Sequence, residues 1–116
     1  MKKNCVSSLA VLFAVVLFLN ACSEDPPSVR VRNDNSAKVN MQLKPAAGSS
    51  VNINDVAANT TSVFIDVAEG QWTATASIQG SSIPPPVSFI ALNDYSYTLI
   101  VTNTNPPKIE TMIEAK

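Results

Sequence analysis

Side chains able to do chemistry are few in this 116-residue chain, which has no histidine and only two cysteines, Cys5 and Cys22. The lack of histidine excludes imidazole catalysis and histidine-containing zinc sites. Acid–base hydrolysis would then need two carboxylates facing one cleft. The candidates are Asp55, Asp66, Asp94 and Glu110. Because these acids fall on predicted turns and strand exteriors, we expect them to serve solubility, and we expect a non-enzyme without a cofactor.

Hard oxygen ligands are the remaining route to a metal site. Asn52, Asn54 and Asp55, together with Asp34, are the residues that suggest calcium. Their spacing lacks the acidic density and the glycine of a calcium-binding loop. The preferred interpretation is a solvated turn, and no metal site is predicted.

The surroundings of Cys22 are more specific. Lys2 and Lys3 begin the chain, and residues 9–19 form an apolar run of 11 residues without a polar side chain. A helix needs about 20 apolar residues to cross a bilayer, so this run is too short to span one comfortably. A positive start followed by a short apolar core is typical of an export signal. We therefore predict that residues 1–21 are a signal peptide.

The sequence Leu19-Asn20-Ala21-Cys22 resembles the bacterial lipobox, the recognition motif of lipoprotein signal peptidase. In that motif a large aliphatic residue stands three places before the cysteine and a small residue directly before it. Leu19 and Ala21 match, whereas Asn20 departs from the usual small or hydroxyl residue. The resemblance implies a lipid thioether on Cys22, cleavage before it, and attachment to a membrane through the lipid. An ordinary secretory signal and an uncleaved short anchor are the alternatives.

Ser23, Glu24 and Asp25 follow the predicted lipid attachment site and are candidate sorting residues. A serine directly after the lipidated cysteine is similar to the pattern that sends lipoproteins of many Gram-negative bacteria to the outer membrane. The acidic pair resembles surface-export signals of Bacteroidetes lipoproteins. The resemblance therefore implies a cell-envelope location, on the periplasmic or surface face of the outer membrane. A plain polar linker would have the same composition.

Removal of residues 1–21 from 116 leaves 95, which is enough for one domain. Without Lys2 and Lys3 the chain has six basic and nine acidic side chains, a net charge near −3. The remaining basic residues are scattered: Arg30, Arg32, Lys38, Lys44, Lys108 and Lys116. Neither nucleic acid nor an anionic lipid surface is predicted as a partner.

Residues 22–28 are polar, contain Pro26 and Pro27, and are predicted to form a tether before a domain at residues 29–116. In that domain apolar and polar residues alternate with period two, which is typical of half-buried strands. The predicted inward residues of seven or eight strands are Val29 and Val31; Val39, Met41 and Leu43; Val51 and Ile53; Val63, Ile65 and Val67; Trp72, Ala74, Ala76 and Ile78; Val87 and Phe89; Tyr95, Tyr97, Leu99 and Val101; and Ile109, Thr111 and Ile113. Residues 68–71 are predicted to form a hairpin in which Gly70 takes a positive φ. These strands predict an all-β, antiparallel β-sandwich of immunoglobulin-like or prealbumin-like type.

The valine-rich segment 28–33, the strand 39–43, and the segment 63–73 with its Gly70-Gln71-Trp72-Thr73 motif resemble the repeat unit of the bacterial domain family DUF4397. The resemblance covers residues 28–79. It implies a β-rich extracytoplasmic module without assigned catalytic residues.

Two aromatic residues are candidate ligand contacts. Trp72 has the inward parity of its strand, which favours a core position with the indole N–H bonded near the sheet edge; an exposed platform for sugar rings is the alternative. Phe64 has the outward parity, so it is covered by a loop, marks a reversed parity, or contacts a partner. The predicted function is a membrane-anchored binding or structural module whose ligand is a glycan or an envelope protein. The alternatives are an accessory subunit that docks by its sheet edge and a carboxylate-based hydrolase.

Overall fold

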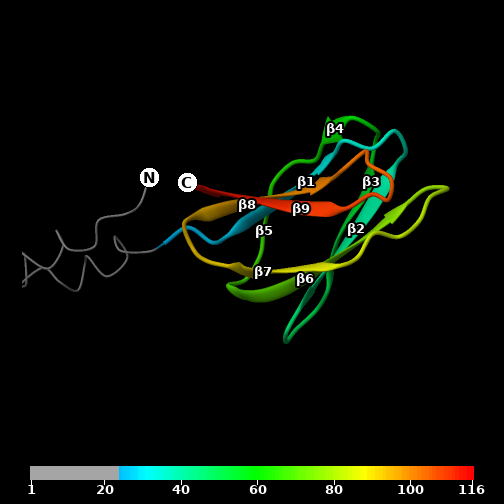
Figure 1. Cartoon of the computed structure of the whole chain (residues 1–116). Coiled ribbons are helices and arrows are strands. Elements are labelled where there is room, and N and C mark those ends of the chain that lie inside the picture. Colours follow the sequence, from blue (N-terminus) through cyan, green and yellow to red (C-terminus); the bar gives the residue numbers. More distant parts are fainter. Residues whose placement is uncertain (1–23) are drawn as a thin grey trace, which may run out of the picture.

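The computed structural model describes residues 24–116, which form two β-sheets packed face to face (Figure 1). The strands are β1 (Ser28–Asn33), β2 (Val39–Pro45), β3 (Val51–Val56), β4 (Thr60–Thr61), β5 (Ile65–Asp66), β6 (Gly70–Ile78), β7 (Val87–Ala91), β8 (Tyr95–Val101) and β9 (Ile109–Ala115). This confirms the predicted all-β sandwich. The described residues form nine strands where seven or eight were predicted, because two short strands, β4 and β5, of two residues each, lie where one strand was expected. Over this part of the chain, no helix is long and apolar enough to cross a membrane.

The first sheet has the order β4-β1-β8-β9, with β5 also paired to β1, and the second has the order β3-β2-β6-β7. Every neighbouring pair is antiparallel except β1 and β8, which run parallel. This parallel pair departs from the purely antiparallel prediction. Alternation within a strand sets its buried face but carries no information about a partner far away in sequence.

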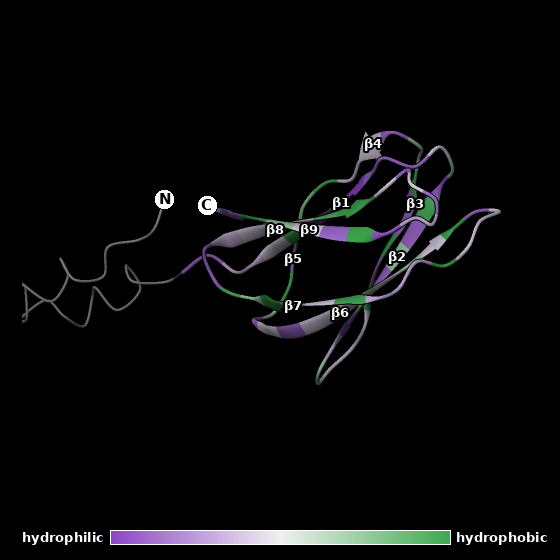
Figure 2. Ribbon diagram, viewed as in Figure 1, coloured by the Kyte–Doolittle hydropathy of each residue, from purple (hydrophilic) through white to green (hydrophobic). Residues whose placement is uncertain are grey.

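The core lies between the two sheets and combines large and small side chains. Along the β2–β6 pair, Met41 lies opposite Ala76 and Leu43 lies opposite Ala74, and all four are buried. A small residue beside a large one leaves room for side chains of the facing sheet, which favours dense packing. Figure 2 shows that apolar and polar residues share the strands of both layers, as expected when each sheet buries one face.

The segment 63–67 does not form the single strand that was predicted. The β1 edge is covered by β4 and β5, and between them the Ser62 hydroxyl accepts the Val31 N–H at 2.9 Å while the Ser62 N–H donates to the Val31 carbonyl at 2.8 Å. Because a side chain takes the place of a strand carbonyl here, the chain bulges away from β1. Val63, predicted to point inward, is 79% exposed.

The predicted hairpin at residues 68–71 is wrong, because β5 belongs to the first sheet and β6 to the second. This connection therefore passes from one sheet to the other. Gly70 does have the predicted positive φ, at 133°. A positive φ at one glycine can be predicted from the local sequence, but it does not reveal which sheet the chain enters next.

Four residues of β8 and β9 depart from the predicted parity of burial, and one of them is Thr111, which was predicted to point inward but is exposed. Thr98 and Ile100 lie on the outer side of β8 but are buried, since β8 is flanked by β1 and β9 and Arg30 Nε donates to Thr98 Oγ1 at 3.1 Å. Ile113 has the inward parity but is 57% exposed, because β9 pairs only with β8 and its other side is open. Sequence parity alone does not distinguish central from edge strands.

Candidate functional site

The residues of the predicted lipid attachment, Leu19, Ala21 and Cys22, lie outside the described residues, as does Ser23 of the sorting signal. Their roles stay predictions from the sequence. The structure begins two residues after Cys22.

The other two sorting residues are docked on the domain. Glu24 Oε1 accepts from Asn93 Nδ2 at 3.0 Å, and the Asp25 N–H donates to Asp94 Oδ1 at 3.1 Å. The Asp94 N–H returns a bond to the Asp25 carbonyl at 2.8 Å, and the Asp94 carbonyl accepts from the Lys116 N–H at 2.9 Å. Asp94 is buried and has a φ of 69°. Through its bonds to Asp25 and Lys116, it holds both ends of the described chain together at one end of the sandwich (Figure 1).

Within the predicted tether of residues 22–28, the described residues 24–28 are packed on the domain instead of extending from it. Pro27 is fully buried and its carbonyl accepts from the Val67 N–H at 2.9 Å, and Ser28 is the first residue of β1. The described part of the N-terminal segment, from Glu24 onward, therefore packs on the domain.

Trp72 occupies the predicted core position. Its side chain is 4% exposed, and its indole N–H donates to the Ala68 carbonyl at 2.9 Å. Stacking on a sugar ring requires an exposed aromatic face, which a buried indole does not offer. Trp72 therefore fixes the connection between the sheets, and the alternative of an exposed platform is not formed.

Phe64 lies on the bulge beside β1 and is 41% exposed. The Arg30 guanidinium carbon lies 4.5 Å from the centroid of the Phe64 ring, a cation–π contact. Of the three interpretations of its outward parity, partial exposure on the outer face agrees with the structure. One side of its ring is covered by Arg30.

Three of the four carboxylates considered for catalysis have separate local partners. Asp55 pairs with Lys38 Nζ at 3.3 Å, Asp66 Oδ1 accepts from the Ser28 hydroxyl at 3.2 Å, and Asp94 binds the Asp25 N–H. Glu110 lies on β9, across the first sheet from β1. Within residues 24–116, no three metal-ligating acidic side chains come together.

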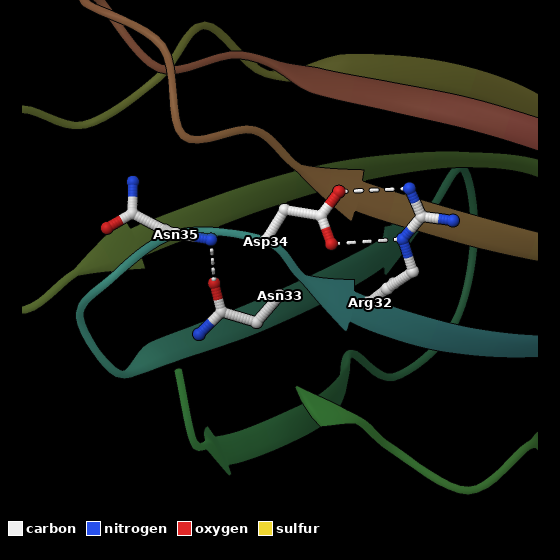
Figure 3. A network of polar contacts seen from close by, with 4 residues as sticks. All are labelled: Arg32, Asn33, Asp34 and Asn35. Carbon is white, nitrogen blue, oxygen red and sulfur yellow. Dashed lines mark hydrogen bonds and ion pairs between the residues drawn. The ribbon is translucent and has the colours of Figure 1, made fainter. Parts of the chain in front are cut away.

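A polar network at the other end of β1 is structural (Figure 3). Arg32 Nε and Nη2 donate to the two carboxylate oxygens of Asp34 at 3.0 and 2.9 Å, and these bonds raise the pKa of Arg32 above its ordinary value. Beside this pair, the Asn35 N–H donates to Asn33 Oδ1 at 2.9 Å. Asn33 is fully buried and every polar atom of its side chain is bonded, so it offers nothing to a ligand.

The sequence reasoning missed one surface, a shallow groove of about 270 Å³ on the outer face of the second sheet. Its exposed polar side chains, which we call the amide groove, are Asn40 and Gln42 on β2, Asn52 and Asn54 on β3, and Thr75 and Ser77 on β6. Gln42 lies between Asn52 and Thr75 in the strand register, and Asn40 lies opposite Ser77. Each residue had the outward parity in the sequence, but only the strand order brings them together.

Comparison with known proteins gives the fold and little more. No protein-family model matches the chain, and no curated protein matches its sequence. An NMR structure of a protein from Eubacterium rectale is similar, with a TM-score of 0.57 over 79% of this chain and 91% of that chain. The sequence identity is 11%, so this similarity supports the β-sandwich and carries no information on ligands.

Proposed function

We propose that this protein is an exported lipoprotein, attached to the outer membrane through Cys22, whose β-sandwich is a non-enzymatic binding or structural module of the cell envelope. The observation that carries the proposal is the position of Cys22: a small residue and a cysteine follow directly at the end of a short apolar run. That arrangement is what lipoprotein signal peptidase recognises.

Lipid on Cys22 would make the attachment stable. Each buried methylene group contributes about 0.8 kcal/mol of membrane affinity, and one acyl chain alone binds only marginally. Two or three chains on one residue would hold the protein in the membrane permanently. With Asp25 bonded to Asp94, the sandwich would then stay close to the bilayer surface.

A binding or structural role agrees with the side chains of the domain. The carboxylates that were candidates for hydrolysis are engaged in separate contacts, with Lys38 for Asp55 and with Ser28 for Asp66. The amide groove provides an exposed polar surface for a ligand instead.

Fractionation of cells that express the full chain tests the anchor. The wild-type protein is expected in the outer-membrane fraction and to require detergent for extraction, whereas Cys22→Ser is expected in soluble fractions. Cys5→Ser is the matched control, since Cys5 lies within the predicted signal and its loss should leave the distribution unchanged. A Cys22→Ser variant that stays in the membrane like the wild type would overturn the proposal.

A further inference from the structure

We infer that the amide groove binds a neutral polysaccharide. This inference names the ligand class of the envelope module and rests on the function proposed above. It depends on the chemistry of the groove lining, the residues chosen for these strand positions, and the shape and orientation of the surface.

The lining contains no ionisable side chain. Asn and Gln amides each donate and accept hydrogen bonds, and Thr and Ser hydroxyls do the same, which suits the hydroxyl groups of a sugar. Two cations flank the lining: Lys38 Nζ lies 3.3 Å from Asp55 Oδ1, and Lys44, two residues beyond Gln42 on β2, lies outside the lining. A carboxylated, sulfated or phosphorylated chain would find no free cation in the lining, so a neutral chain is the better match.

The residue types do not follow from folding alone. Asparagine is depleted in strands, yet Asn40, Asn52 and Asn54 occupy adjacent strands of one face. The outer face of the first sheet has the charged residues usual for a soluble surface, including Arg30, Arg32 and Glu110. Asn40 also has a structural role, because its Oδ1 accepts the Asp55 N–H at 2.7 Å. Threonine or lysine in place of Asn52 and Asn54 would serve strand formation and solubility better. The amide-rich face therefore indicates recognition.

The groove is open and crosses the strands. Three strands about 4.8 Å apart span about 10 Å, which fits a short stretch of an extended chain better than an enclosed small molecule. Ile83 forms one border and is 67% exposed, while Pro84 beside it is fully buried and fixes this part of the β6–β7 connection. The apolar C–H face of a sugar ring can pack on Ile83 while its hydroxyls meet the amides.

The border of the groove at Ile83 lies far from the start of the described chain. In Figure 1 the β6–β7 connection, which carries Ile83, lies at the opposite end of the sandwich from the start of the described chain. A protein attached through Cys22 would therefore present this end of the second sheet to the space beyond the membrane.

Native affinity electrophoresis of the full, processed protein in detergent tests the inference. The gels contain amylose, dextran, mannan or mixed-linkage β-glucan as neutral probes, and hyaluronan or alginate as anionic probes. At least one neutral polysaccharide should retard the protein. Gln42→Ala/Asn52→Ala should weaken that retardation about tenfold or more, since two amides each lose hydrogen bonds to the ligand.

Gln71→Ala/Asn103→Ala is the matched control, because it removes two exposed amides outside the groove. It should bind as the wild type does. The fluorescence of buried Trp72 reports whether each variant is folded. Absence of binding to every neutral probe, tighter binding to an anionic probe, or equal weakening in the control would each overturn the inference.

The outcome is separate from that of the anchor experiment. A protein that needs Cys22 for membrane attachment but binds none of the neutral polysaccharides would contradict the ligand inferred for the amide groove. It would not contradict the proposed envelope lipoprotein. A soluble protein that binds through Gln42 and Asn52 would support the groove and contradict the anchor.

Discussion

Asn33 is fully buried, and its side-chain amide donates to the carbonyls of Ala37 and Val56 at 2.8 and 3.0 Å while its Oδ1 accepts from the Asn35 N–H. One side chain thus joins the β1–β2 turn to the end of β3. Residues 33–36, Asn-Asp-Asn-Ser, have the composition of a loop. That composition did not show which asparagine is buried, because the partner Val56 is 23 positions away.

Replacing Asn33 by alanine would leave these buried groups without partners. We expect the Asn33→Ala variant to lose about 3 kcal/mol of unfolding free energy in urea denaturation, since each unsatisfied buried group costs about 1–3 kcal/mol. Asn103→Ala, at an exposed loop position, should change stability by less than about 0.5 kcal/mol. Equal stability of the two variants would show that the Asn33 bonds do not hold the turn.

The Arg30–Phe64 contact can be measured with a double-mutant cycle. Arg30 also donates to Thr98, so the single variant Arg30→Ala loses more than one interaction. The coupling free energy between Arg30→Ala and Phe64→Ala should be about 0.5–1 kcal/mol, the usual size of an exposed cation–π contact. A coupling free energy near zero would show that the Arg30–Phe64 contact does not stabilise the fold.

At the scale of the strand, the sequence predicts most of what is local. The alternation in residues 39–43 and 72–78 gave the buried faces of β2 and β6, and those residues are buried as expected. The two-residue strands β4 and β5 carry too few residues for a pattern. The parallel β1–β8 pair and the amide groove depend on strand order, which no single strand encodes.

The connection at Gly70 gives a test of its backbone requirement. A φ of 133° disfavours any residue with a Cβ, although nothing lies within 4 Å of the position where a Cβ would stand. Gly70→Ala should therefore lower the unfolding free energy by about 1–2 kcal/mol through backbone strain alone. Gly80→Asn, at a φ of 71° that asparagine tolerates, should cost less. Equal losses of unfolding free energy in the two variants would contradict backbone strain at Gly70 as the cause.

For the whole molecule, the contacts of Asp94 hold the N-terminal segment against the domain. Its carboxylate binds the Asp25 N–H, and its backbone binds Asp25 and Lys116. Asn93 and Asp94 have the composition of a loop, and the sequence predicted a tether before residue 29. It could not show that the two segments meet, since they are 69 positions apart.

We expect Asp94→Ala to free the N-terminal segment, because it removes the carboxylate acceptor and places a Cβ-bearing residue without a local hydrogen-bonding side chain at a φ of 69°. Amide hydrogen exchange at Asp25 should accelerate about tenfold or more, for a lost bond to a charged group of about 1.5–3 kcal/mol. Asp94→Asn keeps an acceptor oxygen and tolerates this φ, so it should stay close to the wild type. Unchanged exchange in Asp94→Ala would show that the segment is held by other contacts.

The intact mass of the protein extracted from its native membrane tests the central claim, lipid attachment at Cys22, most directly. The account predicts a chain that starts at Cys22, carries the added mass of two or three acyl chains, and is absent in Cys22→Ser. An unmodified chain cleaved at another position would contradict it, and would leave a secreted β-sandwich with a free thiol.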